Sequence, residues 1–191
     1  MSTLKVNSII PVAGVPTGGG GGIIQVISNT TKDAVGSISL AAHASGETNF
    51  VDIPNQNVTI TPTSNTSKIL ISFFQYGEFS ATNNGHAFIV KRAISGGATT
   101  HIKGTATGSR SGVLTQACLV YHGDEDSTPE IAQVSNYLDS PSTTSAVTYT
   151  VMTGRIESST SVYYYNRSVG DANASYAERG LSWITVMEVS A

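Results

Sequence analysis

The chain has 191 residues, a mass of 19.9 kDa and a formal net charge of -3, from 10 Lys and Arg against 13 Asp and Glu. Charged residues make up only 12% of it, whereas serine and threonine contribute 25 and 23 residues. So few cations argue against a protein that holds nucleic acid by its phosphates. No window approaches the about 20 apolar residues of a membrane span and no secretory signal is visible, so we expect a soluble protein made in a cytoplasm, without membrane insertion.

Five consecutive glycines at positions 18–22 separate the first 17 residues from the rest of the chain. Glycine has no side chain to pack and the freest backbone, so this run predicts a hinge. The segment before it is too short to fold alone, yet it is rich in apolar residues. Two interpretations stay open: a strand that joins the main sheet, or a peptide that docks on another chain through main-chain hydrogen bonds to an exposed strand edge. The residues expected to anchor such a peptide are Leu4, Val6, Ile9 and Ile10.

Beyond the glycines, the chain consists largely of short runs rich in Thr, Val, Ile, Tyr and Phe, the residues favoured in strands. In the run 56–62, Val58 and Ile60 alternate with polar neighbours, as expected of a strand with one buried face. Residues 67–75 are mostly apolar, which predicts a central strand covered on both faces. Further strands are expected at 87–92, 112–122, 145–152, 161–166 and 181–189.

Clusters of Gly, Asn, Asp, Ser and Pro separate these runs at the spacing of a many-stranded antiparallel protein. No sustained helical stripe of apolar residues occurs, and the best helix candidate, residues 128–138, fits a strand equally well. The sequence therefore predicts an all-β fold, an antiparallel and jelly-roll-like β-sandwich of roughly eight to ten strands with an extended N-terminal arm. The expected units are the anchoring arm 1–17, the hinge 18–22 and the sandwich 23–191.

Aromatic and apolar residues within the expected strands are candidates for the core or for a subunit interface. The residues chosen on this ground are Phe73, Tyr149, Tyr164, Trp183 and Val186. Strand alternation places Tyr163 and Tyr165 on the face opposite to Tyr164, so at least one face presents aromatic rings. Such rings pack in a core, cross an interface or stack on sugars.

Residues that bind metals are few and scattered, so no metal or cofactor is expected. The four histidines lack metal-ligand spacing, and we expect them at the surface or at an interface: His43, His86, His101 and His122. The lone cysteine, Cys118, lies in an alternating apolar run and is expected to be a small buried side chain. Asp124, Glu125 and Asp126 could bind a hard cation such as Ca²⁺, but a solvated turn is the simpler interpretation.

The sequence has no nucleophile signature. There is no G-x-S-x-G elbow, and the glycine run is not followed by the Lys-Ser/Thr of a phosphate loop. A carboxylate pair for glycoside hydrolysis stays open because such pairs meet only in space, and its members would come from Asp52, Glu78, Asp139, Glu157 and Asp171. We therefore expect that the protein is not an enzyme.

Segments spread over the whole chain form a distinctive combination: STLKVNSII at 2–10, GIIQVI at 22–27, NFVDI at 49–53, VTITP at 58–62, SKILI at 67–71, LDSPSTTSAVTY at 138–149, VYYYNR at 162–167 and SWITVMEV at 182–189. Together they resemble small structural proteins of tailed phages of marine bacteria and cyanobacteria. Residues 82–107 depart most from this family. The family carries no catalytic or binding residues that can be transferred to this chain.

This resemblance implies a tail-fibre, appendage or head-decoration component of a virion, made in the host cytoplasm. In this interpretation the arm docks on other virion proteins of the capsid, neck or tail, and the sandwich projects outward as a homotrimer. An alternative is a lectin-like module that recognises host surface glycans through loop residues Asn83, Asn84 and Asp171. A glycan-cleaving tailspike enzyme is the third and least favoured interpretation.

Overall fold

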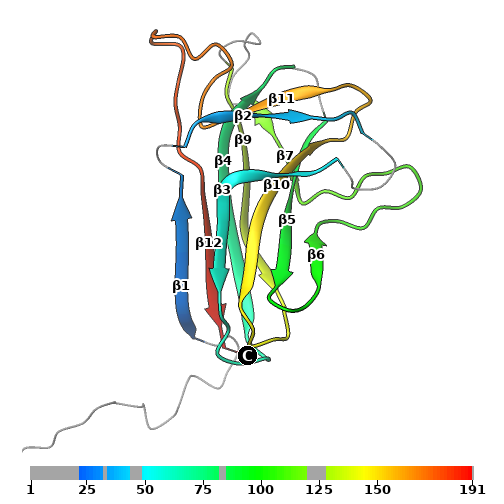
Figure 1. The fold of residues 1–191 in the computed structure, drawn as a ribbon, viewed down its shortest axis with the longest axis vertical. Helices are drawn as coiled ribbons and strands as arrows, with labels where there is room; N and C mark the ends of the chain where they lie inside the picture. Colours follow the sequence, from blue (N-terminus) through cyan, green and yellow to red (C-terminus); the bar gives the residue numbers. More distant parts are fainter. Residues whose placement is uncertain (1–21, 32–33, 44–48, 82–84, 120–127, 191) are drawn as a thin grey trace, which may run out of the picture.

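The computed structural model describes residues 22–31, 34–43, 49–81, 85–119 and 128–190 (Figure 1). Within these ranges, twelve strands form two antiparallel sheets that pack face to face as a β-sandwich, and there is no helix. The predicted all-β sandwich is therefore confirmed. The anchoring residues Leu4, Val6, Ile9 and Ile10 lie outside the described residues, and the division into arm, hinge and sandwich stays a prediction. No described element is an apolar helix of membrane-spanning length.

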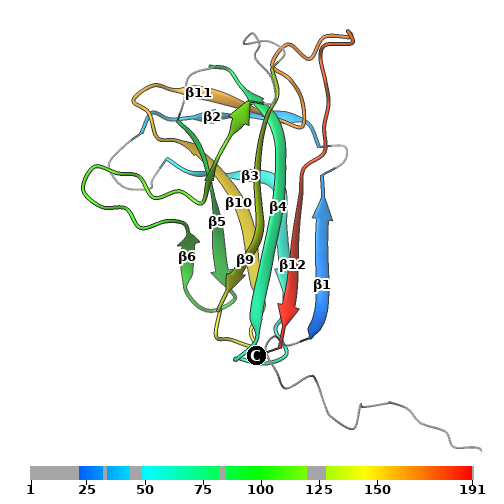
Figure 2. The ribbon, with the colours of Figure 1, turned by 180° about the vertical axis from the view of Figure 1, so that it is seen from behind.

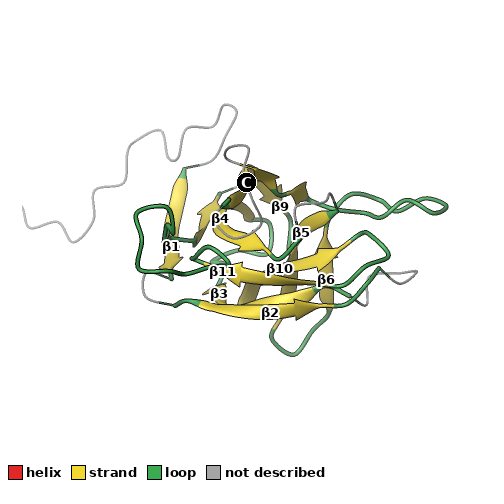
Figure 3. Ribbon diagram, turned by 90° about the horizontal axis from the view of Figure 1, so that it is seen from above, coloured by secondary structure: helices red, strands yellow, loops and turns green. Residues whose placement is uncertain are grey.

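The first sheet has seven strands, built around β4 (Lys68–Phe79). One edge of β4 pairs with β12 (Trp183–Val189) and, further along, with β11 (Ser161–Tyr165). The opposite edge pairs with β9 (Glu130–Asp139), which also pairs with β8 (Cys118–Leu119). The outer strands are β1 (Ile23–Thr30), beside β12, and β2 (Gly36–Leu40), beside β11. In Figures 1, 2 and 3, β1 lies at the side of the molecule.

The second sheet has five strands, with β10 (Val147–Arg155) between β3 (Val51–Ile60) and β5 (His86–Ile94). The outer edge of β5 is shared by β6 (Thr99–Ile102) and β7 (Thr115–Gln116). Alternation sets the packing: Val58 and Ile60 face the core, while Asn57 and Thr59 face outward. This confirms the strand pattern expected for residues 56–62.

The main core lies between the two sheets and is centred on aromatic side chains. Phe79 contacts the ring of Phe88 edge-on at 6.1 Å between centroids, and Tyr163 at 4.5 Å. Of the residues chosen for core or interface, Phe73, Tyr149 and Val186 are completely buried in this cluster. The other two are half-buried: Trp183 stacks on Phe74, and the Tyr164 ring lies beneath the guanidinium of Arg167 at 4.4 Å.

Several local expectations were wrong. Residues 112–122 were expected as one strand, but β7 belongs to the five-stranded sheet and β8 to the seven-stranded sheet. The chain crosses between the sheets at Ala117, whose N–H donates to the carbonyl of His86. Cys118, expected to be buried, is exposed because it follows directly after this crossing, in a two-residue strand.

The histidine expectation also needs correction at one position. His86 is buried in the core rather than at the surface, because β5 directs it between the sheets. His101 is half-buried at β6, and His122 lies outside the described residues. The helical alternative for residues 128–138 is replaced by β9, which pairs with β4 along most of its length.

Candidate functional site

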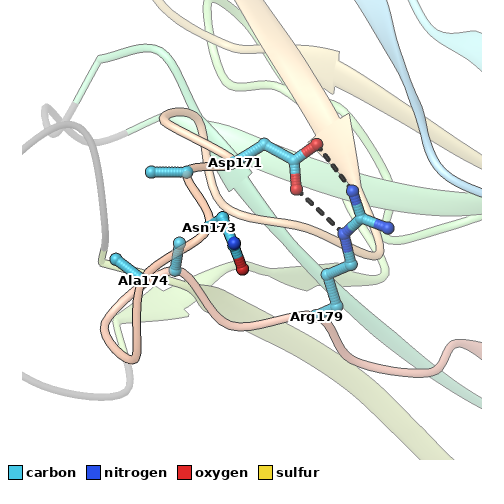
Figure 4. A pocket seen from close by; sticks show the side chains of 6 residues that line it. Asp171, Asn173, Ala174 and Arg179 are labelled. Carbon is cyan, nitrogen blue, oxygen red and sulfur yellow. Dashed lines mark hydrogen bonds and ion pairs between the residues drawn. The ribbon is translucent and has the colours of Figure 1, made fainter.

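The loop between β11 and β12 forms an open hollow of about 450 Å³ near one end of the sandwich (Figure 4), lined by Asp171, Ala172, Asn173, Ala174, Ala177 and Arg179. Of the three loop residues predicted to face a ligand, Asp171 is the one that the structure describes. Asn83 and Asn84 lie outside the described residues, as do Asp124, Glu125 and Asp126.

Asp171 and Arg179 form a two-pronged ion pair across this loop. The guanidinium Nε donates to Oδ1 of Asp171 and Nη2 donates to Oδ2, both at 2.9 Å. These hydrogen bonds hold the pKa of Asp171 below its ordinary value. Arg167 adds a second guanidinium 4.0 Å from the same carboxylate. Asp171 adopts a left-handed backbone conformation, with φ at 41°, so the loop turns sharply there.

The hollow offers polar groups and nearby aromatic surface rather than a reactive centre. Asn173 carries both a donor and an acceptor at its lining. Tyr176 on the same loop is 61% exposed. Hydroxyl-rich molecules bind surfaces that combine hydrogen-bonding groups with aromatic faces. The loop lies at the upper end of the molecule in Figure 1, opposite the end at which β1 begins.

A buried ionisable cluster joins the sheets and was missed in the sequence. Arg155 Nη1 lies 2.6 Å from Nε2 of His86, and the other ring nitrogen, Nδ1, lies 3.5 Å from Glu130 Oε2. Because a guanidinium only donates, Nε2 accepts and Nδ1 carries the proton that faces Glu130. The imidazole also stacks on Phe79 at 3.6 Å. Both ring nitrogens therefore have protein partners, which is the arrangement of a structural histidine.

A second bridge between the sheets involves Asp139 on β9. Its Oδ1 accepts from Arg92 Nη1 and its Oδ2 accepts from the Tyr149 hydroxyl, both at 2.7 Å. Burial and the adjacent carboxylate raise the pKa of the Tyr149 phenol above its ordinary value. The phenol therefore stays protonated and keeps donating to Asp139.

Two of the other carboxylates proposed for a hydrolytic pair, Glu78 and Asp52, also have protein partners. Glu78 accepts hydrogen bonds from the backbone N–H groups of Thr128 and Val169, at 2.9 and 2.7 Å. Asp52 forms an ion pair with Lys91. Glu157 lies on an exposed loop after β10. The described residues contain no cluster of three or more His, Cys, Asp or Glu side chains that could hold a metal ion.

Glu188 on β12 is completely buried and was also missed in the sequence. One carboxylate oxygen accepts from Gln25 Nε2 at 2.6 Å, and the other accepts from the N–H and the hydroxyl of Thr63 at 2.7 Å. Burial alone raises the pKa of Glu188, but the hydrogen bonds from Gln25, Thr63 and Ser67 outweigh it and hold the pKa at about 2. A single Glu in the otherwise apolar run WITVMEV was the available signal.

β1 is the element that continues the predicted arm and hinge. Its outward-facing residues include Ile24 and Val26, which are 45% and 54% exposed. Its inward-facing residues fasten it to the second sheet, because Asn29 Nδ2 donates to the carbonyls of Asn55 and Asn57 at 2.7 and 2.8 Å. This strand therefore combines a rigid attachment on one side with exposed apolar side chains on the other.

Comparison with known proteins gives no family assignment: no protein-family model and no curated protein matches this chain.

Proposed function

We propose that this chain is a non-enzymatic structural protein of a bacteriophage virion, in a tail fibre, appendage or capsid decoration. Its N-terminal arm docks on other virion proteins, and its sandwich projects outward as part of a homotrimer. The protein is made in the host cytoplasm and acts in the virion. The resemblance of segments along the whole chain to phage structural proteins supports this proposal.

The observation that carries the proposal is the position of β1. The predicted apolar arm and glycine run lead directly into it, at one end of the sandwich (Figure 1). Asn29 and Gln25 on β1 donate to carbonyls of the second sheet, so a force on the arm would be transmitted to both sheets. A projecting domain needs this type of attachment at its base.

The buried clusters support a stabilising role for the ionisable groups. His86 contacts both Glu130 and Arg155, Asp139 contacts both Arg92 and Tyr149, and each set joins strands of both sheets. Breaking a buried pair by removing one partner costs about 3–5 kcal/mol. A virion protein must stay folded outside the cell, and this chain's one cysteine cannot form an intrachain disulfide.

The arm is tested by replacing Val6 and Ile10 with Asp in the full chain and measuring its incorporation into purified particles by quantitative mass spectrometry. Burial of each apolar side chain contributes about 1.5–3 kcal/mol, so incorporation should fall more than tenfold, since about 1.4 kcal/mol is tenfold. A variant with Asn7→Asp and Ser8→Asp adds the same charge at polar positions and should be incorporated normally. Equal incorporation of both variants, or particles without the wild-type chain, would contradict the proposal.

A second candidate function, a lectin-like receptor-binding module, is favoured by the hollow at the end of the sandwich opposite the start of β1. Glycan-array binding by the full chain that is lost on Asp171→Asn would support it. Asp52→Asn, which removes a charge from β3, is the matched control. Absence of glycan binding by the wild-type protein would contradict this candidate. Product release from host polysaccharide would instead indicate a glycan-cleaving enzyme.

A further inference from the structure

We propose that the unpaired edge of β1 binds the N-terminal arm of a second copy of this chain, which adds a strand to the seven-stranded sheet. This inference rests on the proposed function in using the arm for assembly, and it names a partner for that arm.

The free edge of β1 has the features of a binding template. β1 pairs with β12 along one side, and no strand among the described residues pairs with its other side. The strand is eight residues long and its sequence, IIQVISNT, contains no charge and no proline. Unpaired N–H and C=O groups on a long edge of this type readily accept another strand.

The edges of β2, β3 and β6 are better protected. β3 carries Asp52 and Pro54, has a positive φ of 62° at Asn55, and shows a shift in register against β10. Its carbonyls at Asn55 and Asn57, and the carbonyl of Thr61 just after it, accept hydrogen bonds from β1 side chains. β2 and β6 are only five and four residues long. Charges, prolines, bulges and short length are the usual protections of sheet edges. Of these, β1 has one shift in register, between Ile23 and Gln25, at its beginning.

The outer face of the seven-stranded sheet carries one apolar row beside this edge. The register places four apolar residues in one row across β1, β12, β4 and β9: Val26, Met187, Leu70 and Leu138. The two at the ends of the row, Val26 and Leu138, are 54% and 52% exposed. An antiparallel sheet that faces water normally has a polar outer face.

The five-stranded sheet shows the normal pattern. Its outer face has a row of three threonines and one alanine across β3, β10, β5 and β6: Thr59, Thr148, Ala93 and Thr99. The Thr59 and Thr148 hydroxyls are also hydrogen-bonded, at 2.8 Å. The next outward row of the seven-stranded sheet, Ser28, Thr185 and Ser72, is also polar. The apolar row that begins at Val26 is therefore the part of that face that we infer to be covered in the assembled protein.

The size of the apolar area favours a strand over a whole domain as its occupant. One row across four strands spans about 19 by 7 Å, or roughly 130 Å². A stable dimer interface buries about 800 Å² on each partner, so face-to-face contact of two sandwiches would be small. Main-chain hydrogen bonds from an added strand supply the missing affinity.

The arm has the sequence of such a strand. From Thr3 to Asn7 polar and apolar residues alternate, with Leu4 and Val6 at the even positions, and the adjacent Ile9 and Ile10 follow. This period of two places Leu4 and Val6 on one face of an extended chain. Beside β1, that face would extend the row that begins at Val26.

The spacer favours a second copy over the arm's own domain. Residues 11–22 separate the alternating segment from β1 and include two prolines and the five-glycine run. A hairpin within one chain normally uses a loop of about 2–5 residues, whereas these twelve residues reach about 40 Å when extended. When the arm of one copy binds the β1 edge of the next copy, the two contacting surfaces differ. Repetition of such a contact around a rotation axis closes a ring of copies.

The test is the oligomeric state of the full chain by sedimentation velocity at micromolar concentration. The wild type should associate, and both Val26→Lys on the edge and Val6→Asp with Ile10→Asp on the arm should weaken association at least about tenfold. Thr99→Lys and Asn7→Asp with Ser8→Asp are the matched controls and should associate like the wild type. Ile24→Lys is a second edge variant, and far-ultraviolet circular dichroism verifies that each variant is folded.

Mixing distinguishes exchange between copies from docking within one chain. The edge variant Val26→Lys keeps its arm, and the arm variant keeps its edge, so an equimolar mixture should form one-to-one complexes that neither forms alone. A monomeric wild type, an edge variant that associates normally, or a mixture without complexes would overturn the inference. If the chain associates through β1 but is absent from purified particles, the proposed function alone is refuted. A chain that enters particles but is a monomer when purified would refute this inference alone.

Discussion

Glu188 gives a quantitative test of how the two sheets are joined beside β1. Its folded pKa of about 2 lies below the value of 4.5 for an unperturbed glutamate. A carboxyl group with a lowered pKa stabilises the fold at pH values above its unfolded pKa, and this stability is lost as the pH falls through the folded pKa. The contribution should therefore be complete near neutrality and disappear between about pH 4.5 and pH 2.

The expected size follows from the shift in pKa. Each pKa unit corresponds to about 1.4 kcal/mol, so the charged form of Glu188 contributes about 3–4 kcal/mol to the free energy of unfolding at pH 7. Glu188→Gln removes the charge and keeps the volume of the side chain. The difference in unfolding free energy between wild type and variant should then shrink by about that amount between pH 7 and pH 2.

Guanidinium chloride unfolding followed by Trp183 fluorescence at several pH values measures this difference. Glu157→Gln, at an exposed loop position, is the control and should change stability by less than about 0.5 kcal/mol at every pH. A difference between wild type and Glu188→Gln that stays constant from pH 7 to pH 2 would refute the reasoning. It would show that the hydrogen bonds from Gln25 and Thr63 do not favour the charged form.

Three further predictions concern the core, the inter-sheet bridge and the arm. Phe73→Ala should lower the free energy of unfolding by about 3–5 kcal/mol in chemical denaturation, because this side chain is completely buried; a loss below 1 kcal/mol would contradict its place in the core. Tyr149→Phe should cost about 1–3 kcal/mol because Asp139 loses a buried donor, whereas Tyr176→Phe, at an exposed ring, should cost almost nothing. Deletion of residues 1–17 should leave the melting temperature within a few degrees of the wild type yet abolish joining to the particle; an unfolded product or normal incorporation would contradict the anchor.

The strand pattern could be predicted from the sequence because alternation reports directly on burial. Val58 and Ile60 point into the core as their spacing indicated, and the expected strands at 145–152 and 161–166 correspond to β10 and β11. The sequence of residues 67–75 predicts a strand covered on both faces. In the structure, the described residues fully cover one face of β4. The outward-facing Leu70 of β4 belongs to the part of that prediction that a partner would complete.

Features that depend on distant partners could not be predicted. The buried cluster of His86, Glu130 and Arg155 joins three strands, and no local spacing relates their positions. Alternation also does not specify to which sheet a residue belongs, so the crossing at Ala117 was missed and Cys118 was assigned to the interior. In the candidate site, Asp171 was chosen as a loop carboxylate, but its partner Arg179 follows only from the folded loop.

The most direct test of this account is an electron cryomicroscopy map of phage particles that contain the chain. We expect a β-sandwich on the outside of the particle, with continuous density running from the start of β1 along residues 1–21 into a neighbouring subunit. Purified particles without the chain, or density in which residues 1–21 pair with their own sandwich and contact no neighbour, would contradict it.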